Sequence, residues 1–164
     1  MENLIFSKAE LCDLDIIMQL YKYVIKTTFT TWDENYPSKE LIKSDIQNKN
    51  LYVLKKDNKI IAVSFLGKKE EENENWYLPY KKAYGVARIC VSPEFQCKGI
   101  ATIFMKYLIQ EAKNQNVDTM HFHVCTKNIS AIKAADPCII HWYMVYPPCL
   151  TKIAKSCKWM LSWV

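Results

Sequence analysis

Residues 91–112 read VSPEFQCKGIATIFMKYLIQEA, and this stretch decides the fold that we expect for the whole chain. Gly99 is one of only three glycines among 164 residues, and it stands where a long amphipathic helix begins. Glycine in a helix costs about 1 kcal/mol relative to alanine, so its placement there calls for a reason. The N-terminal end of a helix supplies one, because its unpaired N–H groups and its dipole attract anions.

The loop from Gln96 to Ala101 is accordingly predicted to bind a pyrophosphate through its backbone amides. Because Gly99 has no side chain, a bulky phosphate can approach the backbone closely there. Lys98 adds a positive charge at the same place. The alternative is an ordinary strand–turn–helix connection with an incidental glycine, since short glycine motifs often match by chance.

The remaining sequence predicts one α/β domain over residues 1–164. Apolar periodicity predicts strands at 4–6, 51–54, 60–66, 84–91, 119–125, 139–146 and 159–164. Helices are expected to follow Asp13 and Ser38, which we interpret as N-caps, and to span 99–115 and 128–135. The polar residues 68–82 indicate an exposed loop. The order β α α β β β α β α β β predicts a mixed, mostly antiparallel central sheet flanked by helices.

Composition narrows the class of protein. The net charge of +5 comes almost wholly from lysine, with Arg88 as the only arginine, and interspersed acidic residues argue against a nucleic-acid-binding face. The sequence shows no secretory signal, and no apolar run approaches the ~20 residues that span a bilayer. A cytoplasmic protein without a membrane partner is therefore expected. The seven cysteines form no C-x-x-C pair, which favours buried free thiols in a reducing compartment.

The pattern Gln96-x-x-Gly99-x-Ala101, placed after a strand that ends in Val91-Ser92-Pro93, resembles motif A of the GNAT superfamily of acyl-CoA-dependent N-acetyltransferases. The following strand 120–124 and the segment Asn128-Ile129-Ser130-Ala131-Ile132 resemble the next strand and the N-x-x-A-I segment of that family. The resemblance covers residues 3–133 in layout and is specific over 84–133. Residues 134–164 diverge from the family pattern, through sequence divergence or a changed reading frame.

This resemblance implies that acetyl-CoA is the co-substrate and that no metal is needed. The pyrophosphate would lie on the backbone of Gln96, Cys97, Lys98, Gly99, Ile100 and Ala101. The pantetheine arm would bond the main chain of Ile89, Cys90 and Val91 and would meet Asn128. A backbone N–H near Val91 would polarise the thioester carbonyl.

The resemblance also implies where the acceptor and the proton-transfer groups lie. Trp32 and Tyr36 would face the acceptor, although an aromatic pair that closes the core is an equal alternative. His123 occupies the position of the general base in one branch of the family, and histidine can act as a base near pH 7; the alternative is a structural, half-buried histidine. The family's usual acid, a tyrosine, is replaced by Ala135.

The function that we expect is N-acetyl transfer from acetyl-CoA to a primary amine of a small molecule or peptide, by direct attack in a ternary complex. The main alternative is an acyl-CoA-binding module with weak or no transferase activity, because the acid position holds Ala135. Tyr143 or Tyr146 could supply the missing hydroxyl, but each also fits a packed strand. A metal site at His121, His123 and Cys125 and a nucleophilic Cys90 or Cys125 are less favoured. A homodimer is compatible with the sequence.

Overall fold

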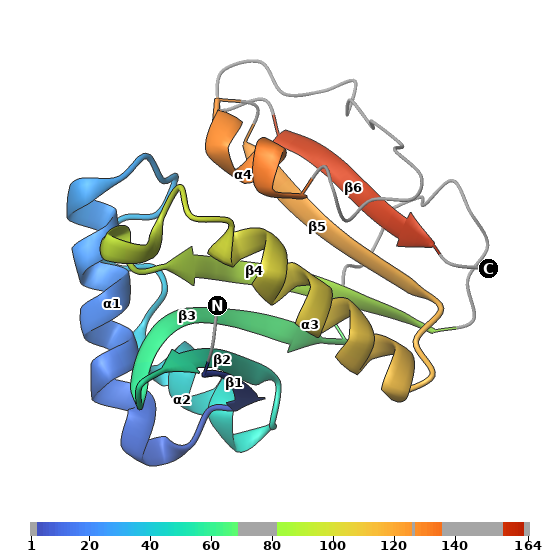
Figure 1. The fold of residues 1–164 in the computed structure, drawn as a ribbon, viewed down its shortest axis with the longest axis horizontal. Coiled ribbons are helices and arrows are strands. Elements are labelled where there is room, and N and C mark those ends of the chain that lie inside the picture. The colour runs from blue at the N-terminus through green and yellow to red at the C-terminus, as the bar shows by residue number, and fades with distance from the viewer. Residues whose placement is uncertain (1–2, 69–81, 126, 136–155, 163–164) are drawn as a thin grey trace.

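The computed structural model describes residues 3–68, 82–125, 127–135 and 156–162, and these residues form a six-stranded sheet with helices on both faces (Figure 1). The strands are β1 (Leu4–Lys8), β2 (Leu51–Lys56), β3 (Lys59–Gly67), β4 (Ala83–Val91), β5 (Thr119–Cys125) and β6 (Ser156–Ser162). The helices are α1 (Leu14–Thr27), α2 (Lys39–Gln47), α3 (Ile100–Asn114) and α4 (Ile129–Ala135), with short 3-10 turns η1 (Leu11–Asp13) and η2 (Pro93–Phe95).

The strands lie in chain order across the sheet. Neighbouring strands run antiparallel except β4 and β5, which are parallel. This arrangement confirms the mixed, mostly antiparallel sheet predicted from the order of elements. The last strand begins three residues earlier than the expected 159–164, while the expected strand 139–146 and most of the loop 68–82 lie outside the described residues.

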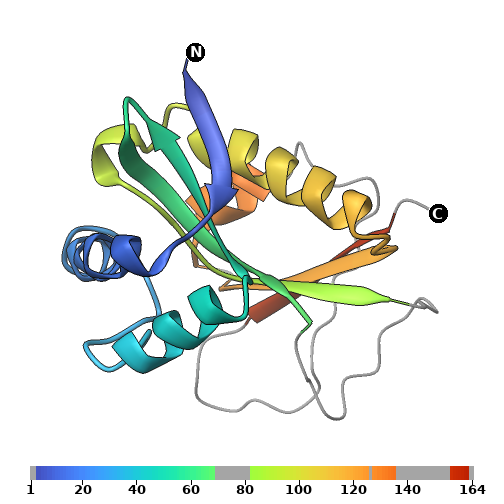
Figure 2. The ribbon, with the colours of Figure 1, turned by 90° about the horizontal axis from the view of Figure 1, so that it is seen from below.

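Two hydrophobic cores cover the two faces of the sheet, with α1 and α2 on one face and α3 and α4 on the other (Figure 2). Helix α3 buries five side chains in the core on its face of the sheet: Ile100, Phe104, Met105, Leu108 and Ala112. Helix α1 buries four side chains in the core on the opposite face: Leu14, Ile17, Tyr21 and Val24. Both sets recur at helical spacing, so each helix has one apolar face that it presents to the sheet.

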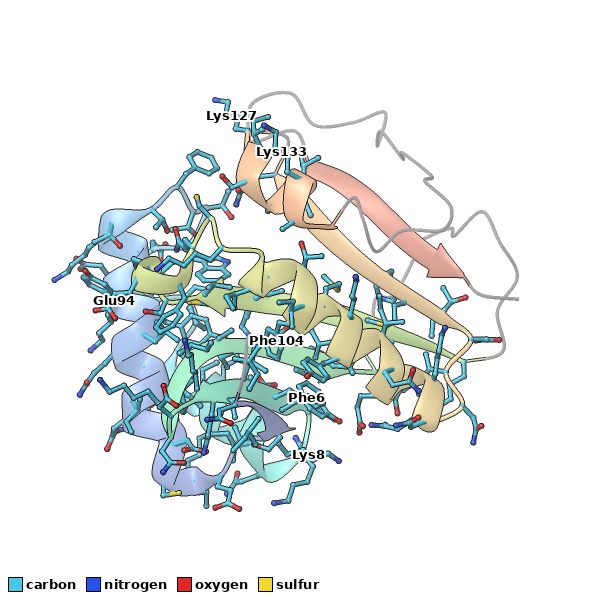
Figure 3. The ribbon with its side chains drawn as sticks, viewed as in Figure 1. Phe6, Lys8, Glu94, Phe104, Lys127 and Lys133 are labelled. Carbon is cyan, nitrogen blue, oxygen red and sulfur yellow. The ribbon has the colours of Figure 1, made fainter. Side chains whose placement is uncertain are left out.

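Aromatic rings join β1 to the α3 face. The ring of Phe6 stacks on Tyr52 with centroids 5.4 Å apart and meets Phe104 edge-on at 6.0 Å (Figure 3). Offset-stacked and edge-on ring pairs are the arrangements that aromatic quadrupoles favour. These contacts fix the edge strand against α3.

The two predicted helix caps have different outcomes. Ser38 Oγ accepts a hydrogen bond from the Leu41 N–H at 3.2 Å, which confirms it as the N-cap of α2. Asp13 is not a side-chain cap of α1, because η1 leads directly into that helix. Its carboxylate instead accepts from the Glu10 N–H at 3.0 Å and pairs with Lys55 Nζ at 3.1 Å.

The sheet divides between β4 and β5. These strands pair only from Ala83 with Thr119 to Val86 with Phe122. Beyond that point β4 remains paired to β3, and β5 remains paired to β6. At the point of separation β4 carries a bulge, because two of its residues, 88 and 89, lie opposite Ser64 alone. The sheet therefore opens beside the strand end that leads to the Gly99 loop.

Candidate functional site

The loop between β4 and α3 has a backbone that only certain residues adopt easily. Gly99 occupies the N-cap position of α3 with φ 74° and ψ 3°, in the left-handed region. A Cβ built on Gly99 would meet no atom within 4 Å, so conformation and not crowding by the protein accounts for the glycine. Cys97 also has a positive φ, of 56°. Left-handed residues near a helix start turn successive N–H groups toward one side, as in anion-binding nests.

The loop is open to solvent where the amides would receive a ligand. Cys97, Lys98 and Gly99 are exposed, whereas Ile100 is buried in the α3 core. The first turn of the helix closes with a bond from the Ile103 N–H to the Gly99 carbonyl at 3.0 Å. The amides of Ile100 and Ala101 therefore belong to the first turn of the helix, where N–H groups have no intrahelical acceptor.

Two side chains of the loop bind carbonyl groups of the same connection. Gln96 Nε2 donates to the Val91 carbonyl at 2.9 Å, and Lys98 Nζ donates to the Glu94 carbonyl at 2.8 Å. The Lys98 ammonium also lies 5.7 Å from the centroid of the Phe95 ring. Lys56 Nζ approaches the same ring at 5.8 Å. The positive charge of Lys98 thus lies beside the loop, held by the loop's own backbone.

The end of β4 presents main-chain groups on the side where β5 has separated. The Ser92 N–H bonds the Ile61 carbonyl at 2.8 Å, so Ser92 faces β3. Main-chain groups alternate in direction along a strand, which puts those of Val91 and Ile89 on the opposite side. Cys90 contributes a core side chain, and burial raises the pKa of its thiol to about 12. Such a thiol is a poor nucleophile near neutral pH.

Helix α4 lies close to the start of α3. Asn128 Oδ1 accepts from the Ala131 N–H at 3.0 Å and so caps α4. Thr102 Oγ1 of α3 donates to the Ala134 carbonyl of α4 at 2.9 Å. Figure 3 shows Lys133 on α4 and Lys127 just before this helix. Asn128 and the Gly99 loop therefore lie on one face of the sheet.

A polar cluster around Arg88 lies on the other face, beneath α1 and α2. Arg88 is the residue of the β4 bulge with φ 52°, and its guanidinium pairs with the Asp45 carboxylate of α2. It also lies 4.7 Å above the Phe65 ring and donates from Nη1 to the Tyr36 hydroxyl at 3.4 Å. The buried Tyr21 hydroxyl donates to the Arg88 carbonyl at 2.8 Å, and its burial raises its pKa well above the usual value.

The two aromatic residues expected at the acceptor differ in their surroundings. Trp32 is half-buried and meets Tyr21 edge-on with centroids 5.4 Å apart, so it takes part in the core of this face. Tyr36 is 40% exposed, and its hydroxyl is held by Arg88. Of the two, Tyr36 is the side chain that a molecule arriving on this face could touch.

Sequence reasoning did not find the Arg88 cluster or the Gln96 bond. Arg88 stood out as the only arginine and as a charge within an apolar strand, which is a signal for a buried, paired cation. Its partner Asp45 lies in a helix 43 residues away in sequence and gives no local signal.

The predicted proton-transfer residues can be placed only in part. His123 lies in β5 opposite Lys158 of β6, beyond the last pair with β4. Ala135 is the last residue of α4. Tyr143 and Tyr146 lie outside the described residues. Among the described residues, no three or more His, Cys, Asp or Glu gather as a metal site, and no helix has the length and apolarity to cross a membrane.

A family model identifies the family of this chain, and solved structures share its fold. The model of the Acetyltransferase (GNAT) family matches residues 17–136. A search of curated protein sequences finds no significant match. Solved structures with the same fold include a GNAT-family acetyltransferase from Streptococcus agalactiae, with a TM-score of 0.76 and 18% identity over 99% of this chain and 97% of that one.

Two further structures resemble the chain over nearly its whole length. The ribosomal-protein-alanine N-acetyltransferase of Brucella melitensis has a TM-score of 0.74 and 14% identity over 97% of this chain and 99% of that one. The protein yncA of Salmonella typhimurium, solved with its cofactor acetyl-CoA, has a TM-score of 0.71 and 13% identity over 98% and 94%. With a family match over most of its length and this fold, the chain belongs to the GNAT family of acetyl-CoA-dependent acetyltransferases.

Proposed function

We propose that this protein transfers the acetyl group of acetyl-CoA to a primary amine of a small molecule or peptide, by direct attack within a ternary complex. The observation that carries the proposal is the separation of β4 from β5 after Val86 and Phe122, on the strand whose end leads into the Gly99 loop. Beyond this point no ladder of hydrogen bonds joins β4 to β5, and we infer that the donor and the acceptor meet between these strand ends. A donor held on one face can thus meet an acceptor that arrives on the other.

On the α3 face, the residues present fit the donor. The amides from Gln96 to Ala101 would hold the pyrophosphate, with the charge of Lys98 beside them. The outward main-chain groups of Ile89 and Val91 would bond the pantetheine amides. Since an amide side chain has both an acceptor and donors, the Nδ2 group of Asn128 would serve the ligand while its oxygen caps α4. Cys90 and Ile100 would contribute through their backbone only.

On the α1 and α2 face, the acceptor amine would approach past Tyr36. An N–H at the end of β4, near Val91, would stabilise the oxyanion that forms when the amine attacks the thioester. His123 is the proposed base that takes the amine proton, because its position in β5 lies beyond the last pair with β4. Loss of the family's tyrosine at Ala135 leaves the thiolate to be protonated by solvent or by a residue outside the described part.

Transfer is tested by incubating the protein with acetyl-CoA and a panel of amines, which includes polyamines, aminoglycosides, amino acids and peptides with free N-termini. We expect free thiol to be released together with an acetylated product of the matching mass. With an accepted amine, His123→Ala should lower the rate by about 10²-fold, the usual contribution of a positioned base. An unchanged rate would remove His123 from the mechanism. Binding of acetyl-CoA without thiol release across the panel would favour the binding-module alternative.

Cys97 offers a test of the donor site that needs no acceptor. Its thiol is exposed within the proposed pyrophosphate loop, while Cys12 is also exposed, at η1 and 85 residues away in the chain. CoA should slow the alkylation of Cys97 by N-ethylmaleimide at least tenfold and leave Cys12 unaffected, as followed by peptide mass spectrometry. Equal protection of both thiols, or of neither, would contradict the proposed location. Cys90 should remain unmodified because it is buried.

A further inference from the structure

We propose that the Gln96 side chain is a positioning residue that joins the two halves of the donor site, an inference that rests on the proposed function. One half is the end of β4, which would bind the pantetheine. The other half is the Cys97–Ala101 loop, which would bind the pyrophosphate. Gln96 lies between them in the chain, and its Nε2 reaches back to the Val91 carbonyl at 2.9 Å.

The bond closes a ring of the main chain from Val91 to Gln96. Inside this ring the backbone makes two further bonds, from the Phe95 N–H to the Ser92 carbonyl at 2.8 Å and from the Gln96 N–H to the Pro93 carbonyl at 3.2 Å. The 3-10 turn η2 is thereby fixed within the connection, but neither backbone bond reaches β4 itself. Among the described residues, the Gln96 side chain makes the hydrogen bond that ties the turn to the end of the strand.

The carbonyl that Gln96 binds lies on the side of β4 that faces the opening, as the alternation from Ser92 requires. Gln96 therefore occupies a carbonyl there while it leaves the N–H groups of Val91 and Ile89 for a ligand. Directly after Gln96 come the exposed residues Cys97 to Gly99. The side chain thus sets the distance and angle between the N–H groups of the strand and those of the loop.

The distance and angle between the strand end and the loop matter because CoA is a long ligand that must bind both at once. When two linked groups bind two aligned sites, the second contact benefits from a high effective concentration. If the sites lose their alignment, each group still binds alone, but the joined ligand loses this advantage. Removing the Gln96 bond should therefore lower the affinity for intact CoA more than the affinity for either of its fragments.

The experiment compares Gln96→Met, which keeps the length of the side chain without the donor, with Gln110→Met as the matched control. Gln110 lies on the exposed surface of α3 and bonds only Asn114 in the described structure. Ligand-observed NMR and titration calorimetry measure the affinities of CoA, 3′-phosphoadenosine 5′-diphosphate and acetylpantetheine. Loss of one hydrogen bond sets the expected size: Gln96→Met should weaken CoA about five- to tenfold and each fragment less than twofold. Gln110→Met should change none of them.

Each outcome decides the matter. If Gln96→Met weakens the diphosphate fragment as much as CoA, the residue acts only within the loop, and the inference fails. If it strengthens acetylpantetheine, Gln96 competes with the ligand for the Val91 carbonyl, and the inference also fails. Equal CoA affinity in both variants and the wild type overturns the inference while the proposed function stands. A wild type that binds no CoA overturns the proposed function itself.

Discussion

Gly99→Asp is expected to lower the affinity for CoA by more than two orders of magnitude while the domain stays folded. Gly99 has a positive φ of 74° and open space around its missing Cβ. Aspartate tolerates the left-handed region better than most residues, so the fold should accept it. The new carboxylate would lie at the proposed pyrophosphate site. If the new carboxylate lies about 4 Å from a phosphate charge, at an effective dielectric constant near 20, their repulsion costs about 4 kcal/mol. This energy corresponds to a loss of affinity of more than a hundredfold.

The control is Gly99→Asn, which has the same shape and the same tolerance of positive φ but no charge. It should weaken CoA through the volume of its side chain alone, and less than Gly99→Asp does. Raising the salt concentration should narrow the gap between the two variants, because it screens the repulsion of exposed charges. Titration calorimetry measures both affinities, and circular dichroism verifies the fold. If Gly99→Asp and Gly99→Asn bind CoA equally, no anion lies at this helix start.

The parts of the fold that could be predicted are those with local signals. The apolar stripe of α3, the cap at Ser38 and the position of Gly99 depend on residues within one or two turns of each other. Such patterns follow from helix periodicity and from unpaired N–H groups, which act over short distances. The position of the Gly99 turn at the start of α3 therefore followed from the sequence, while its role in binding the cofactor stays a prediction.

The parts that sequence could not give depend on contacts between distant segments. The bulge at Arg88 arises from the register of β4 on β3, and its ion pair with Asp45 joins residues 43 positions apart. The hydrogen bond from the Gln96 side chain to the Val91 carbonyl depends on how η2 turns the chain back toward Val91. Asp13 precedes α1 at the N-cap position, as predicted, but its side chain makes no cap bond. Its carboxylate accepts from the Glu10 N–H across the turn η1, which the local sequence does not reveal.

Breaking the buried pair of Arg88 and Asp45 should have the largest effect on stability. Both side chains are 9% exposed. The Arg88 guanidinium also donates a hydrogen bond to the Tyr36 hydroxyl and stacks over the Phe65 ring. Asp45→Leu would leave the Arg88 charge buried without its carboxylate partner, which costs about 3–5 kcal/mol in comparable pairs. The free energy of unfolding, measured by urea denaturation, should fall by that amount. Arg88→Met should cost about as much, because it leaves the Asp45 carboxylate alone.

The double variant Asp45→Leu/Arg88→Met separates the charge from the packing. Because it leaves no buried charge, it should recover most of the lost stability, as hydrophobic replacements of buried pairs often do. The exposed pair of Lys39 and Asp15, whose side chains are 57% and 75% exposed, is the matched control, and Asp15→Ala should cost less than about 1 kcal/mol. Additive losses in the double variant would mean that Arg88 and Asp45 stabilise the fold separately. If the double variant instead recovers the lost stability, the pair contributes little net stability. Its main role would then be to hold α2 in place against the β4 bulge, where the sheet opens.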